Sequence, residues 1–158
     1  MRAREPDESG YVVNDGVRVY YEVFGDGEPT LLLMPTWQIV HSRMWKLQVP
    51  YLARHYRVVT FDPRGNGRTD RPADTAAYDA DRIADDARAV LDVTGTGAAV
   101  VVAHCAGSTQ ALVLAKEHPD RVQALVALSL NLDLAPAHEE RRHRDFDGAL
   151  DSDEGWAK

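Results

Sequence analysis

The residue with the clearest potential for chemistry is the single cysteine of the chain, Cys105. It follows an almost uninterrupted apolar run at 98–103 and precedes a helix-like segment at 106–117. A short apolar run of this kind is typical of a strand buried on both faces. A side chain on a tight turn between such a strand and a helix is exposed at the strand's carboxyl end, where the helix dipole favours negative charge. A nucleophile at this turn would therefore be open to a substrate, whereas a lone cysteine elsewhere is more often a small core side chain.

Three further apolar runs predict the sheet that must position this turn. Residues 30–34, 57–61 and 124–130 are short and bounded by Gly, Pro or polar residues. Such runs are typical of parallel strands that helices cover on both faces. Before them, residues 11–24 alternate apolar and polar side chains around an Asn-Asp-Gly turn. That pattern predicts an antiparallel hairpin with one solvent-exposed face.

Helices are predicted between these strands. Residues 79–94 carry apolar side chains at helical spacing, with acidic residues in the first turn, and residues 106–117 end before Pro119. The segment 42–54 is predicted to be helical in part, with Pro50 breaking it or beginning a second short helix. Strands that alternate with helices predict an α/β fold, here an N-terminal antiparallel hairpin followed by a parallel βαβ sheet.

Two segments carry a resemblance to a known family. Residues 103–107 read Ala-His-Cys-Ala-Gly, which resembles the G-x-S-x-G nucleophile elbow of the α/β-hydrolases, with Ala103 for the first glycine and cysteine for serine. Residues 61–70 read Phe-Asp-Pro-Arg-Gly-Asn-Gly-Arg-Thr-Asp, which is similar to the family's D-x-R-G-x-G-x-S loop. The resemblance covers roughly 11–130 and implies a truncated α/β-hydrolase with Cys105 in the nucleophile's position.

The resemblance also implies an oxyanion hole made by backbone N–H groups. The family usually has His-Gly after the strand that corresponds to residues 30–34, whereas this chain has Pro-Thr-Trp. The donor there is expected to be the N–H of Thr36 or Trp37, paired with the N–H of Ala106 after the nucleophile. Asp62 in the second motif is expected to fix its loop, together with the neighbouring arginine, rather than to take part in chemistry.

A thiol nucleophile also needs a base and an orienting acid. In the family these follow on later strands, in the order nucleophile, acid, histidine, and we expect this chain to end before them. His41, beside the predicted oxyanion site, and Asp133, after the fourth parallel strand, are the candidate base and acid. The alternative for Asp133 is a structural role, in which its side chain caps a loop. His104 is expected to pack rather than to act, because neighbours on a tight turn point apart, and His138 is expected to be solvated.

The composition argues against several other classes. With 18 basic against 25 acidic residues, the net charge of −7 opposes nucleic-acid binding. The apolar runs are far shorter than the roughly 18 residues of a membrane span, and we expect no membrane association. One cysteine and six scattered histidines predict neither a disulfide framework nor a metal site. The glycines of 65–70 lack a third glycine and a following helix, so no cofactor is expected. The N-terminal segment has no apolar signal region, which predicts a cytoplasmic protein.

Taken in order, the sequence predicts a flexible segment at 1–10, an α/β-hydrolase-like part at 11–130, and a charged tail or the start of a cap region at 131–158. The resemblance implies a hydrolase or acyltransferase acting on a small ester or thioester, completed by a missing C-terminal part or another chain. The alternative is a non-catalytic truncated hydrolase that serves as a binding or interaction module. A sheet that stops after its fourth parallel strand leaves apolar surface uncovered, so a homo-oligomer or a complementary chain is expected.

Overall fold

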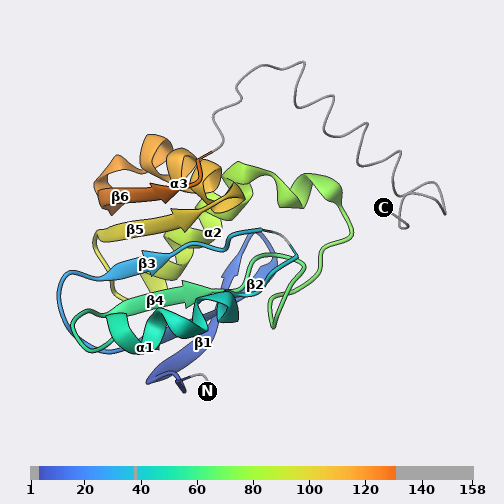
Figure 1. The fold of residues 1–158 in the computed structure, drawn as a ribbon. Helices are drawn as coiled ribbons and strands as arrows, with labels where there is room; N and C mark the ends of the chain where they lie inside the picture. Colours follow the sequence, from blue (N-terminus) through green and yellow to red (C-terminus); the bar gives the residue numbers. More distant parts are fainter. Residues whose placement is uncertain (1–3, 38, 131–158) are drawn as a thin grey trace, which may run out of the picture.

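The computed structural model describes residues 4–37 and 39–130. Its sheet has six strands in the spatial order β1-β2-β4-β3-β5-β6 (Figure 1). The first two pairings, β1 with β2 and β2 with β4, are antiparallel, and the other three are parallel. The predicted α/β architecture is therefore confirmed. The elements are β1 (Glu8–Asn14), β2 (Val17–Phe24), β3 (Leu31–Leu33), η1 (Ser42–Leu47), α1 (Val49–Leu52), β4 (Val58–Phe61), η2 (Thr75–Tyr78), α2 (Ala80–Val93), β5 (Ala99–His104), α3 (Ala106–Glu117), η3 (Pro119–Arg121) and β6 (Val122–Leu128).

The N-terminal hairpin forms as predicted, but it begins earlier. Asp15 and Gly16 at its turn have φ values of 50° and 74°, the left-handed backbone that a two-residue hairpin turn requires. The first strand starts at Glu8, which pairs with Val23 of β2. The prediction of a flexible segment at 1–10 is therefore wrong for its last three residues, because their backbone belongs to the sheet.

The second strand of the hairpin lacks the predicted solvent-exposed face. Of the polar positions on β2, only Arg18 is exposed, whereas Tyr20 and Glu22 are buried. Two arginines from distant segments cover them. Arg43 of η1 forms an ion pair with Glu22 at 2.7 Å, and the guanidinium of Arg68 lies 4.8 Å from the ring centre of Tyr20. The local alternation was correct, but β2 is an interior strand and elements from elsewhere in the chain pack on it.

Helices cover the two faces of the sheet according to the alternation of its strands. On one face, Leu32 and Val101 pack with α2 and α3. On the other face, which α1 covers (Figure 1), Leu33 packs with Trp45 of η1 and Val49 of α1. Successive residues of a strand thus enter opposite cores, as expected of a sheet that is buried on both sides.

The predicted helices are confirmed with small shifts at their ends. Residues 79–94 contain α2, and α3 occupies 106–117. The segment 42–54 divides into η1 and α1, with Pro50 in the first turn of α1, where the missing N–H leaves no intrahelical bond unmade. No helix within the ranges 4–37 and 39–130 has the length and apolar content needed to cross a membrane.

The last strand, β6, differs from the expectation of a strand buried on both faces. It is the outer strand of the described sheet, next to β5. Val126 and Leu128 are 44% and 47% exposed. The reason is that no described element packs over these side chains, although α3 covers the opposite face. The run 124–130 was read correctly as a strand, and its burial was overestimated. The predicted tail or cap region at 131–158 lies outside the described residues.

Candidate active site

Cys105 lies at the junction between β5 and α3, as the sequence predicts. Its backbone has φ 55° and ψ −128°, a conformation that residues other than glycine rarely adopt. Its N–H donates to the carbonyl oxygen of Leu128 at 3.0 Å, and its own carbonyl accepts from the N–H of Ser108 at 2.9 Å. The residue is exposed and its thiol is free. The chain therefore holds a strained turn that places an exposed thiol at the N-terminus of a helix.

We expect the strain at this turn to be measurable without any substrate. A residue with a Cβ loses about 1–3 kcal/mol of stability when it is held in such a conformation. Glycine adopts the conformation freely, but its flexibility in the unfolded chain lowers stability by about 0.4–1 kcal/mol. Cys105→Gly should therefore raise the free energy of unfolding by up to about 2 kcal/mol in urea denaturation. The matched control is Ala106→Gly, one residue along, which should lower it by about 0.5–1 kcal/mol. Equal losses in both variants would show that position 105 is unstrained.

The loop after β3 packs directly against the first turn of α3. A Cβ placed on Gly107 would overlap the carbonyl oxygen of Pro35 and would lie 3.5 Å from the Cα of Thr36. The position therefore requires glycine, and its small size brings the Pro35–Thr36 backbone beside the residues that follow Cys105. The structure thus brings together two of the segments that the sequence named, although they are far apart in the chain.

Backbone donors at this contact suit a developing negative charge. Ala106 is the first residue of α3, and its N–H has no hydrogen-bond acceptor in the described part of the chain. Thr36 is buried, and Trp37, with 48% of its surface exposed, stands at the rim of the same loop. Unpaired N–H groups at a helix start stabilise an anion. The oxyanion roles of Thr36, Trp37 and Ala106 stay predictions.

The candidate bases and acids are not joined to the thiol. His41 caps η1, where its Nδ1 accepts from the N–H of Arg43 at 3.2 Å. His104 is half-buried on β5, and Asp133 lies outside the described residues. Within 4–37 and 39–130, no imidazole or carboxylate is hydrogen-bonded to the sulphur of Cys105. Nor do three or more His, Cys, Asp or Glu side chains in these ranges gather into a group that could hold a metal ion.

The loop after β4 is fixed by the carboxylate of Asp62. One oxygen accepts from the N–H of Ser42 at 2.8 Å, and the other accepts from the N–H of Arg68 at 2.9 Å. A Cβ on Gly67, whose φ is 53°, would overlap this carboxylate. Asp62 therefore ties its own loop to the start of η1, the segment that follows the predicted oxyanion loop. The structural role expected for this residue is confirmed.

A buried ion pair anchors the same loop to α2. Arg64 is 1% exposed and donates to both oxygens of Asp86, at 2.6 and 2.8 Å, while Asn14 donates to Asp86 at 2.7 Å. The hydrogen bonds of Arg64 with Asp86 raise the pKa of its guanidinium above its ordinary value. At the end of the loop, the hydrogen bonds of Arg18 lower the pKa of the Asp70 carboxyl.

Asp86 is the residue of this network that the sequence analysis missed. It lies on the face of α2 that also buries Ile83, Ala87 and Val90. The available signal was a carboxylate at a position where helical spacing calls for an apolar side chain. Such a carboxylate is buried only with a partner, and an arginine in the glycine-rich loop was the natural candidate.

The family model described as alpha/beta hydrolase fold matches residues 29–155. With the described sheet and the turn at Cys105, this match shows that the chain belongs to the α/β-hydrolase fold family. Among curated relatives, RutD from Caulobacter segnis, for which carbamate hydrolysis is the suggested activity, is 40% identical over 88 residues, 56% of this chain and 33% of RutD. The 2-hydroxymuconate semialdehyde hydrolase of Pseudomonas sp. strain CF600 is 34% identical over 124 residues, 78% of this chain and 44% of the hydrolase.

Solved structures give the same family. A variant of an epoxide hydrolase from Vigna radiata superposes with a TM-score of 0.76 and 30% identity, over 87% of this chain and 45% of that one. Est816, an N-acyl homoserine lactone degrading enzyme, superposes with a TM-score of 0.75 and 32% identity, over 89% of this chain and 54% of its own. The chain thus spans about a third to a half of the length of the relatives that it matches.

Proposed function

We propose that this chain provides the nucleophile-bearing part of a hydrolase or acyltransferase that acts on a small ester or thioester through Cys105. The observation that carries the proposal is the turn itself. An exposed thiol stands at the start of α3 on a backbone with φ 55°, and the Pro35–Thr36 loop lies against the same helix start. A strained strand-to-helix turn that exposes a nucleophile beside backbone donors is the arrangement that acyl transfer requires.

The proposed reaction has two steps. In the first, the sulphur of Cys105 as thiolate attacks the carbonyl carbon, the carbonyl electrons move onto oxygen, and the backbone N–H groups of Ala106 and of Thr36 or Trp37 stabilise that oxyanion. Collapse of the intermediate forms an acyl-thioester and expels the alcohol or thiol, which takes up the proton that the cysteine lost. In the second step, water or an acceptor alcohol attacks the acyl carbon of the thioester, the C–S bond breaks, the acid or the new ester leaves, and the proton of the attacking water or alcohol restores the thiol.

The proton transfers of this scheme need a base and an acid. We propose that a C-terminal part or a complementary chain supplies the base and the acid. Within this sequence, His41 and Asp133 are the candidates for these two roles. The exposed outer strand β6 is a place where such a part, or a second copy, would continue the sheet. The names of the relatives support hydrolysis of small molecules, and the lactone that Est816 degrades is an ester. The cytoplasm stays the proposed compartment.

The test is acylation of the folded chain by 4-nitrophenyl acetate at neutral pH. Intact mass and peptide mapping should place an acetyl group on Cys105, formed at least about tenfold faster in the folded chain than in urea. Cys105→Ala should show no adduct on that peptide, and Cys105→Ser should react slowly. Because the chain has no other cysteine, thiol labelling needs no background correction. An equal rate in folded and unfolded chains, or ester hydrolysis that survives Cys105→Ala, would overturn the proposed nucleophile.

The alternative function is a binding or interaction module without catalysis. One observation favours it: no imidazole or carboxylate of residues 4–37 and 39–130 reaches the thiol by a hydrogen bond. The acylation test separates the two functions, because a binding module has no reason to accelerate thiol acylation on folding. Under that alternative the thiol is a small side chain at an exposed turn.

A further inference from the structure

An apolar face of the sheet is left uncovered at β5 and β6. Val126 and Leu128 of β6 are 44% and 47% exposed. Val126 pairs in parallel register with Val102 of β5, and Ala124 pairs with Val100, so these four side chains point to one face of the sheet. Val100 and Val102 are partly buried against the core beneath η1 and α1. The exposed face is therefore an open continuation of that core.

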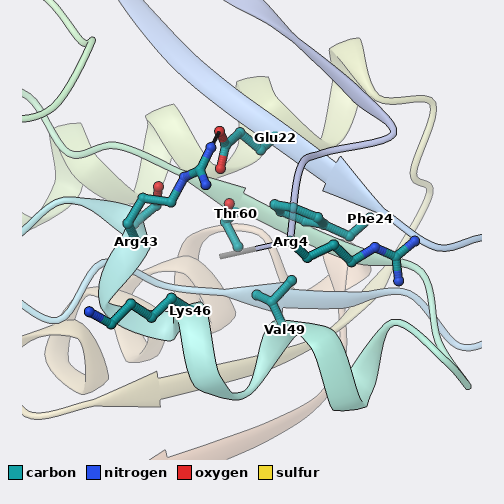
Figure 2. Close-up of a pocket in the computed structure, with 8 residues that line it drawn as sticks. Arg4, Glu22, Phe24, Arg43, Lys46, Val49 and Thr60 are labelled. Atoms are coloured by element: carbon teal, nitrogen blue, oxygen red, sulfur yellow. Dashed lines mark hydrogen bonds and ion pairs between the residues drawn. The ribbon is translucent and has the colours of Figure 1, made fainter. Parts of the chain in front are cut away.

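Helix α1 covers a different part of the sheet. Its Val49 points toward Phe24 of β2, and both line one pocket with Thr60 of β4 (Figure 2). The strand β6 is the edge of the sheet on the far side of β5 (Figure 1), and α3 covers its opposite face. Residues 122–130 contain no charged side chain and no proline. Charges and proline are the usual protection of an exposed strand, so an open apolar face without them favours association.

The chain that follows β6 contains a segment of matching chemistry. In 145–158 the large apolar residues are Phe146, Leu150 and Trp156. At 3.6 residues per turn, these three side chains share a stripe of about 120° on a helix. Four of the five acidic residues in this range fall outside the stripe. The range also contains two glycines, which weaken an isolated helix, so such a helix depends on burying its stripe against an apolar face.

The length of the connection favours this segment over a separate molecule. The described chain ends at Leu130, two residues after β6. The next 15 residues span up to about 50 Å when extended, whereas the seven residues of β6 span about 23 Å. Residues 146–157 can therefore reach any point of the open face, at an effective concentration in the range of about 1 mM.

We propose that residues 146–157 dock as an amphipathic helix on the open face of β5 and β6, with their apolar stripe against Val102, Val126 and Leu128. The docked helix extends the core beneath η1 and α1 across the last two strands. The acidic residues outside the stripe stay in solvent. The inference uses the face of the sheet and the pattern of the segment, so it does not depend on the proposed function of Cys105.

Photocrosslinking of the full chain tests where the segment lies. The photoreactive residue p-benzoylphenylalanine replaces Leu150 in one variant and Asp151, on the opposite side of the helix, in the control. We expect irradiation to join position 150 to residues 99–104 or 122–128 of the same chain, located by peptide mapping. Position 151 should give no crosslink there. Crosslinks that double the mass would show that a second copy covers the face, and they would contradict the proposal, as would a lack of crosslinks to these strands.

Hydrogen exchange of residues 122–128 tests the energetic contribution of docking. Leu150→Asn should speed their exchange at least about tenfold, because the docked helix loses a buried leucine. The matched control, Asp151→Asn, removes a solvent-facing side chain and should leave the exchange unchanged. Exchange in 80–93, the range of α2, should be the same in both variants, which excludes global unfolding as the cause. Equal exchange of 122–128 in the two variants would mean that Leu150 does not dock on the sheet.

Discussion

Replacing Asp86 with alanine lowers the free energy of unfolding by about 3–5 kcal/mol, the largest stability effect that we expect from a single substitution in this chain. Asp86 is fully buried and accepts from both Arg64 and Asn14. Its removal leaves the Arg64 guanidinium, itself 1% exposed, without its counter-charge. Urea or thermal denaturation measures the loss.

The neighbouring position gives the matched control. Asp85 precedes Asp86 on α2, and its side chain is 40% exposed beside Arg88 and His118. Asp85→Ala should cost less than about 1 kcal/mol, because partly exposed ion pairs contribute little. A double replacement, Asp86→Leu with Arg64→Met, should recover most of the loss, since apolar residues can replace a buried pair. A loss in Asp86→Ala no larger than in Asp85→Ala would contradict the buried pair.

Gly107→Ala should harm both stability and the thiol site. The added methyl group overlaps the Pro35 carbonyl oxygen, so either α3 or the loop at Thr36 must move. Overpacking of this kind costs about 1–3 kcal/mol. Because a displacement of about 1 Å in a reacting geometry lowers rates by about 10²-fold, acylation of Cys105 should slow by a similar factor. Denaturation and acetylation by 4-nitrophenyl acetate measure the two effects.

Gly97→Ala is the control for that substitution. Gly97 lies in a loop, its Cβ would meet nothing within 4 Å, and its φ is not in the left-handed region. We expect stability to change by less than about 0.5 kcal/mol and the acylation rate to stay the same. If Gly107→Ala behaves like Gly97→Ala, then the Pro35–Thr36 loop does not pack on α3 as the structure has it.

The parallel part of the fold could be predicted because its strands carry their own signal. Short apolar runs and amphipathic helices recur in alternation, and each is readable from neighbouring residues. The face of β2 was not readable in this way. Tyr20 and Glu22 are buried by Arg43 and Arg68, which are distant in sequence. No pattern among neighbouring residues indicates such contacts. The exposure of Val126 was missed for the converse reason, because an apolar run shows only that a strand can be buried.

The candidate site was predictable in part for a related reason. The turn at Cys105 is local, so strand, small residues and helix were enough to place it. The packing of Gly107 against Pro35 joins two turns far apart in sequence, and only the resemblance to the family pointed to it. Asp86 needed the three-dimensional structure, because its importance comes from burial beside a partner that is distant in sequence.

The carbonyl oxygen of Leu128 links the outer strand to the turn of the nucleophile. It accepts from the Cys105 N–H at 3.0 Å and from the Ser108 hydroxyl at 3.1 Å, so both ends of that turn depend on one atom of β6. Fraying of the strand breaks both bonds at once and frees the strained backbone to relax. The rate at which the thiol reacts therefore reports how well β6 stays paired at the open edge of the sheet. Any segment or partner that binds at that edge would also set the geometry of Cys105.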